Sequence, residues 1–294
     1  MIKRTVVTWS AIGISLTLFC SSVAFGSDTS SDDTRTESPA HTLMAISGLN
    51  DQLDALPNAV RISFDQLLIA DGLVEPFESA DVPQLRSAVG SVFNAKALQD
   101  SILAELESIM SPADSSELVQ FYKTDTGIDL RTAERDNSIL ENAARFQGWY
   151  RDTGLHGLTN ERQDVIKKLE VSMQATRGAV DAMIGMQIAM QVSLTPILPA
   201  AEQLSPVQLQ GVAEELRPEL TAIYYESSLE TLAFVFKDLS LSALRDYAEV
   251  LDTDAGQRYV RAVNDGLSRG LFNSAEKLGF LLQDILAVRL GQGA

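Results

Sequence analysis

The chain has 294 residues, of which 40 are acidic and 23 are basic, so its formal net charge at pH 7 is −17. This acidity opposes binding to nucleic acid or to an anionic lipid surface, and it favours solubility. The single cysteine, Cys20, excludes a disulfide framework, so stability has to come from burial of a core.

The N-terminus has the pattern of a secretory signal peptide. A basic start, Met1–Arg4, precedes an apolar stretch over residues 6–24, and a small-x-small site ends at Gly26. We therefore expect residues 1–26 to be a signal peptide cleaved after Gly26, and the mature protein to be periplasmic. Retention of this stretch as a membrane anchor is the alternative, which the small residues and the lack of a second span disfavour.

Residues 27–42 are rich in Ser, Thr and Asp and hold no apolar residue larger than alanine. Such a segment cannot bury enough surface to offset the entropy of ordering, so we expect a disordered leader. His41 lies at its end.

Beyond the leader, apolar residues recur at helical spacing. Stripes over residues 43–56, 60–68, 82–93 and 98–109 predict helices, with Pro57 as a stop between the first two. Ser111-Pro112 is typical of a helix N-terminus, where proline loses no hydrogen bond. No stretch alternates with period two for long enough to predict a strand, so the fold class is all-α.

A four-residue pattern occurs twice, as Thr124-Asp125-Thr126-Gly127 and as Thr253-Asp254-Ala255-Gly256, at an offset of 129 residues. In both copies the threonine can cap a helix, the aspartate lies in its first turn, and the glycine lets the preceding helix approach closely. We interpret Thr124, Asp125, Gly127, Thr253, Asp254 and Gly256 as structural corners without a catalytic role. The fixed offset predicts two tandem, related helical-bundle halves.

We place the first helical half at residues 43–152 and the second at 153–294. The second half begins with a helix capped by Thr159 or Asn160, and its Ser205-Pro206 start leads to Pro218, which should kink or break the helix. Its most apolar stretch, residues 179–200, is too interrupted by polar residues and prolines to span a membrane. Within it Met183, Met186 and Met190 form a stripe that either lines an apolar groove or fills the core.

The segment Glu117–Gly127, with Phe121-Tyr122 before Thr124 and Gly127, resembles the bacterial family called domain of unknown function 2059. Members typically carry a motif close to Phe-Tyr-x-Thr-x-x-Gly. The second copy has Val250-Leu251 in place of the aromatic pair, although Thr253 and Gly256 are kept. The resemblance covers mainly residues 95–137 and 160–270 and implies two tandem copies of an exported, all-helical fold. It implies no activity.

The common catalytic chemistries find little support. His41 and His156 are the only histidines and are far apart in sequence, so we expect no metal site and no serine triad. No glycine-rich phosphate loop is present, and we expect no cofactor. Glu215, Glu219, Glu226 and Glu230 leave an acid-pair hydrolase open as a weak alternative, although such clusters are usually solvated helix faces.

Three functions therefore stay open. The first is a non-enzymatic periplasmic protein that binds a partner or an apolar ligand between its halves, with the methionine stripe as lining. The second is a structural or envelope-stress accessory that works through protein contacts alone. The third is the acid-pair hydrolase. A methionine-lined cavity would favour the first, a filled core with exposed apolar side chains the second, and two carboxylates converging in a cleft the third.

Overall fold

The computed structural model describes residues 38–70, 78–195 and 203–291, and every regular element in these ranges is a helix, which confirms the all-α prediction. The expected signal peptide and residues 27–37 of the expected leader lie outside the described residues. No helix in the described part of the chain is both long and apolar enough to cross a membrane.

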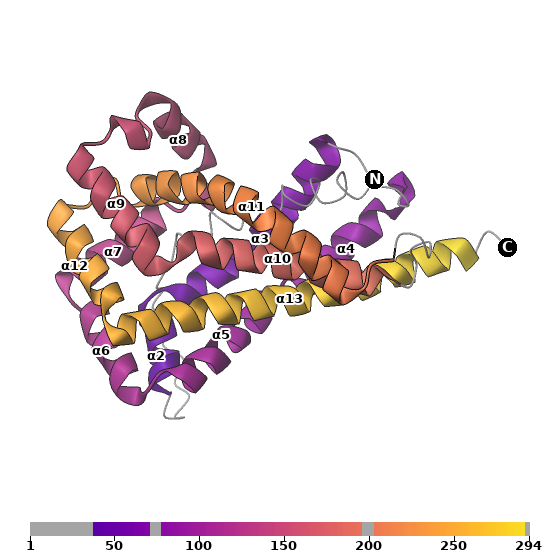
Figure 1. Cartoon of the computed structure of the whole chain (residues 1–294), viewed down its shortest axis with the longest axis horizontal. Coiled ribbons are helices and arrows are strands. Elements are labelled where there is room, and N and C mark those ends of the chain that lie inside the picture. The colour runs from indigo at the N-terminus through magenta and orange to yellow at the C-terminus, as the bar shows by residue number, and fades with distance from the viewer. Residues whose placement is uncertain (1–37, 71–77, 196–202, 292–294) are drawn as a thin grey trace.

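The helices follow one another with short connections (Figure 1). In the N-terminal part they are α2 (Pro39–Ile46), α3 (Leu49–Ala70), the 3-10 turn η1 (Ser79–Asp81), α4 (Val82–Val92), α5 (Ala95–Ile109), α6 (Pro112–Tyr122) and α7 (Asp125–Asp136). The rest comprises α8 (Ile139–Asp152), η2 (Leu155–Gly157), α9 (Asn160–Met173), α10 (Ala175–Leu194), α11 (Pro206–Val235), α12 (Leu241–Asp252) and α13 (Asp254–Gly291).

Helix α13 is the central element of the fold. It packs against α10 and α5 along much of its length and also contacts α4, α6, α9 and α12. Glycines make this close packing possible: a Cβ at Gly266 would lie 2.5 Å from the Cα of Ile102 on α5, and one at Gly279 would lie 2.1 Å from the Cβ of Ser193 on α10. At its C-terminal end α13 extends beyond the other helices (Figure 1).

The start of the fold differs from the sequence prediction. Residues 39–42, which the composition places in a disordered leader, form the first turn of α2, and the Ser38 hydroxyl caps this turn by accepting from the backbone N–H of His41. The leader composition hid a serine–proline helix start, the same device that begins α6. Burial of Leu43 and Met44 then holds the short helix on the core.

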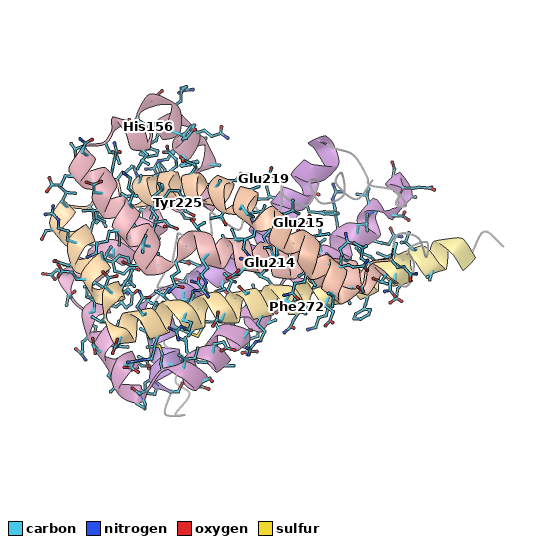
Figure 2. All side chains as sticks on the ribbon, viewed as in Figure 1. His156, Glu214, Glu215, Glu219, Tyr225 and Phe272 are labelled. Atoms are coloured by element: carbon cyan, nitrogen blue, oxygen red, sulfur yellow. The ribbon has the colours of Figure 1, made fainter. Side chains whose placement is uncertain are left out.

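Neither internal proline ends its helix. Pro57 lies inside α3, contrary to the predicted stop, and Pro218 lies inside α11, which continues for 30 residues and changes direction near Glu219 (Figure 2). Proline in a helix interior removes a hydrogen bond and costs about 3 kcal/mol. In α3 the burial of Leu53, Leu56 and Val60 around Pro57 offsets this cost.

The buried side chains form two clusters, and each takes residues from both sides of the predicted boundary at residue 152. The larger cluster joins α2–α6 with α10, α11 and α13, whereas the smaller joins α7 with α9, α11, α12 and the start of α13. The two parts of the chain are therefore interlocked in one continuous fold.

The helix packing nevertheless repeats along the chain. Helix α2 packs against α6 as α9 packs against α12, and α3 packs against α5 as α10 packs against α11. A residue with positive φ separates the first two helices of each set, Gly48 between α2 and α3 and Gln174 between α9 and α10. A Thr corner then joins α6 to α7 and α12 to α13.

Candidate functional site

The two Thr corners have the same local geometry. The Thr124 side chain accepts from the Gly127 N–H at 3.1 Å, and its hydroxyl donates to the Phe121 carbonyl at 2.7 Å. At the second corner Thr253 accepts from the Gly256 N–H at 3.0 Å and donates to the Val250 carbonyl at 2.8 Å. Asp125 and Asp254 lie in the first turns of α7 and α13.

The corner glycines lie against backbone. A Cβ at Gly127 would be 2.4 Å from the Phe121 carbonyl oxygen, and a Cβ at Gly256 would be 2.2 Å from the Val250 carbonyl oxygen. These contacts account for glycine at both positions by packing alone. The six corner residues occupy helix caps and helix first turns, where their geometry has a structural explanation.

Met183 and Met186 of the methionine stripe do not line the pocket described below. Met183 and Met186 are buried in the larger core cluster, packed between α10 and its neighbours, and the side chain of Met190 lies outside the described residues. Filling of an irregular core is an ordinary role for methionine, whose flexible side chain adapts to gaps.

A small cavity lies where helices from both predicted halves meet. Its volume is about 30 Å³, and α3, α5, α9, α12 and α13 all contribute to its wall. Most of this wall is apolar and is made by Leu49, Ile102, Leu251, Val260, Val263 and Leu267. The polar side chains that line it are those of Gln52, Tyr247, Tyr259 and Asn264, and Met173 completes it.

Three tyrosines and one glutamate form a buried group around this junction. Tyr122, Tyr247 and Tyr259 come from α6, α12 and α13, and Glu134 comes from α7. Burial is the main cause that raises the pKa of each tyrosine, and the charge that Glu134 would carry raises it further. Burial likewise raises the pKa of Glu134 well above its usual value, against the opposing effect of Arg131.

Ring contacts also join the two predicted halves, through Phe121 and Tyr247. The Phe121 and Tyr247 rings stack with their centroids 6.0 Å apart and an interplanar angle of 5°, while Phe121 and Tyr122 meet edge to face. Stacked and edge-to-face aromatic pairs contribute about 0.5–1.5 kcal/mol beyond their buried area. The aromatic pair in the first corner segment thus binds α6 to α12.

The glutamates considered for an acid pair are spread along α11. Glu215, Glu219 and Glu226 are exposed, and Figure 2 shows Glu215 and Glu219 well away from His156, which lies beside the other end of that helix. Glu230 is half-buried and accepts a hydrogen bond from the Leu155 N–H at 2.8 Å, and burial raises its pKa. Glu230 thereby holds the η2 turn against α11.

Metal-binding chemistry finds no support in residues 38–70, 78–195 and 203–291, because no group of three or more His, Cys, Asp or Glu side chains there is arranged to hold an ion. His41 lies in α2 and His156 in η2, so the two histidines are on separate elements.

Sequence reasoning missed Gln52 and Glu134, and a helical register would have found both. Gln52 lies among Leu49, Leu53 and Leu56 on the inner face of α3, and Glu134 follows Leu130 by one turn on the inner face of α7. In both cases the signal in the sequence is a polar residue at a position where the helical spacing of apolar residues predicts an apolar one.

A third missed feature is an ion pair between the halves. Arg258 on α13 donates two hydrogen bonds to the Asp114 carboxylate, from Nε at 3.0 Å and from Nη2 at 2.8 Å. Asp114 also accepts from the backbone N–H and the hydroxyl of Ser111, the cap of α6. The hydrogen bonds from Arg258 and Ser111 lower the pKa of Asp114 to about 2.

Four exposed apolar side chains lie on helix segments at the end of the molecule opposite η2. Figure 1 shows the C-terminal end of α10, the N-terminal end of α11 and the C-terminal part of α13 together there. Val192, Val207, Phe280 and Val288 on these segments are exposed. We call this set of four side chains the apolar tip.

Comparison with known proteins gives no relative: no family model matches the chain, and neither a curated protein nor a solved structure is significantly similar to it.

Proposed function

We propose that the mature protein is a non-enzymatic, exported helical protein of the periplasm that acts through contact with a partner protein, using the apolar tip. The proposal of export rests on the basic start, apolar stretch and small-x-small site over residues 1–26. The proposal of partner contact rests on the filled core and on where apolar side chains are left exposed.

The cavity described above offers little room for an apolar ligand. The cavity of about 30 Å³ is smaller by an order of magnitude than the roughly 300–1,000 Å³ that pockets for drug-sized ligands have. Met183 and Met186, the expected lining, are buried in the core and contact other side chains there. These observations favour a surface role over transport of a lipid.

The observation that carries the proposal is the C-terminal part of α13. Leu282 and Leu286 on this segment are buried, whereas Phe280 is 52% exposed and Val288 is 60% exposed. About half of Phe280 thus stays exposed on a stretch of α13 where Leu282 and Leu286 are buried. Contiguous exposed apolar surface marks sites of interaction, and we infer that the four side chains of the apolar tip provide one.

We also propose that the fold arose by duplication and is related to the family called domain of unknown function 2059. Helices α9, α10 and α12 are packed as α2, α3 and α6 are, which supports the proposed duplication. The proposed relationship to the family is supported by the first corner segment, in which the pair Phe121-Tyr122 is followed by the capping Thr124 and the close-packed Gly127. Each of these features has a structural role, so the relationship would bring no activity.

A photo-crosslinking experiment tests the partner contact. A photoreactive phenylalanine analogue would replace Phe280 in one variant and Val171, a 68% exposed residue on α9, in a matched control. After illumination of cells, we expect the first variant to form an adduct of defined mass that the control lacks. The adduct should disappear when V192D and V207D are added, with the helical circular dichroism unchanged.

The opposite outcomes would contradict the proposal. Equal adducts from positions 280 and 171, or no adduct from position 280, would show that the apolar tip binds no partner. An adduct with the mass of two copies of this chain would show that the apolar tip contacts a second copy of the chain and would contradict a separate partner protein. Recovery of the chain from the cytoplasm with residues 1–26 still attached would contradict the proposed export.

A further inference from the structure

The side chain of Gln52 is buried without a hydrogen-bond partner. It lies on the inner face of α3, is 6% exposed, and neither its amide nitrogen nor its amide oxygen is hydrogen-bonded within the described protein. Buried amides almost always have partners, because the loss of their hydrogen bonds to water is otherwise uncompensated. Gln52 therefore indicates that something in its surroundings supplies both an acceptor and a donor.

Gln52 lines the cavity from α3, and Tyr259 lines it from α13. Tyr259 is 3% exposed. Its hydroxyl makes no hydrogen bond within the usual geometric limits, although hydrogen bonding with Ser47 and Tyr122 lowers its pKa against the effect of burial. The cavity is thus lined by a carboxamide residue from one helix and a phenol residue from another.

The size and charge of the cavity restrict what it can hold. About 30 Å³ is room for roughly two water-sized molecules, at about 10–15 Å³ for each. The polar groups that line it are amides and phenols, which are neutral, so an ion would lack a counter-charge. The occupant has to be neutral, very small, and both a donor and an acceptor of hydrogen bonds.

We propose that this cavity is a hydration site at which two ordered water molecules bridge Gln52 on α3 and Tyr259 on α13. The waters accept from the Gln52 amide N–H, donate to its carbonyl oxygen, and exchange a hydrogen bond with the Tyr259 hydroxyl. They join α3 to α13 in a wall whose other polar side chains are those of Tyr247 and Asn264. This proposal is independent of the partner contact at the apolar tip.

The test counts long-lived internal waters by oxygen-17 magnetic relaxation dispersion on the full chain. Gln52→Met keeps the length of the side chain and removes its polar atoms, and Gln147→Met at an exposed position of α8 is the matched control. We expect the dispersion amplitude to fall by the equivalent of about two waters in Q52M and to be unchanged in Q147M. Y259F, a milder change, should lose about one water and keeps the test open if Q52M folds poorly.

Thermal unfolding gives an independent readout of the same variants. If water satisfies Gln52, Q52M breaks those hydrogen bonds and should not raise the melting temperature. If the cavity is dry, Q52M removes a costly unpaired amide and should raise it. Equal dispersion amplitudes in the wild type, Q52M and Y259F would overturn the proposal, as would an organic molecule that native mass spectrometry finds bound to the wild type and absent from Q52M.

Discussion

The two Thr corners are alike in their hydrogen bonds and unlike in the helices that they begin. The first leads into α7, of 12 residues, and the second leads into α13, of 38 residues, against which most of the fold packs. A local rule of one capping threonine and one close-packed glycine therefore fixes the turn. The surroundings fix how much the whole molecule depends on it.

Positions at the offset of 129 residues show where the two predicted halves differ. Val263 on α13 corresponds to Glu134 on α7, so a buried acid in the first predicted half matches an apolar cavity wall in the second. Asp114 pairs with Arg258, whereas the residues at the same offset, Ala243 and Asp129, have no such pair to make. The polar groups at these positions differ, while the Thr caps are the same.

The largest effect should come from filling the corners. Gly256→Ala forces a Cβ against the backbone of Val250 and Leu251, and we expect a loss of about 3 kcal/mol or more in the free energy of unfolding. Gly127→Ala should cost a similar amount locally, since its contacts are of the same kind. Urea unfolding followed by circular dichroism measures both.

Gly211→Ala is the matched control for these variants. Gly211 lies inside α11 with no atom within 4 Å of the added Cβ, so alanine should stabilise the chain by about 0.5–1 kcal/mol through helix propensity. A corner variant that behaves like G211A would show that the close contact at that corner is absent in solution.

The buried acid on α7 should make stability depend on pH. Its pKa is raised in the folded protein, so the fold binds a proton that the unfolded chain releases above about pH 4.5, and stability falls as pH rises from there. Glu134→Gln removes this dependence. We expect E134Q to match the wild type below pH 4.5 and to exceed it above, by up to about 1.4 kcal/mol for each pH unit. Parallel curves of unfolding free energy against pH would refute the shift.

The caps test whether the corners are equal in energy. Thr124→Ala and Thr253→Ala each remove one side-chain cap and one donated hydrogen bond, and each should cost about 1 kcal/mol. Thermal unfolding of the two variants and of the double variant should give additive losses, because the sites are in different corners. A cost at Thr253 several times that at Thr124 would show that the rule is not local.

The smallest effect should come from the ion pair between the halves. The pKa of Asp114 is lowered to about 2, so its contribution is present above pH 3.8 and is lost as pH falls toward 2. The advantage of the wild type over Asp114→Asn should shrink over that window. Arg258→Gln should show the same trend, and a double-mutant cycle without coupling between the two would contradict a direct pair.

The sequence predicted the features that depend on neighbours along the chain. Four side chains cap helices at positions that the sequence pattern indicated, namely those of Ser111, Thr124, Thr159 and Ser205. Such caps can be predicted because the hydrogen bond that makes a cap joins residues within one helical turn. The prediction for Pro57 was wrong because the packing of α3 decides the outcome there. The cavity was beyond sequence reasoning altogether, since α3, α5, α9, α12 and α13 meet only through contacts distant in the chain.

The glycines of α13 have a consequence for how the molecule is made. Helices α4, α5 and α10 all pack on α13, which the ribosome synthesises after all three of them. Until α13 emerges, α4 and α5 have only α2 and α3 to pack on among the described helices, and α10 has only α9 and α11. Completion of the larger core cluster therefore has to wait for α13, which contributes residues from Ala255 to Leu282 to it.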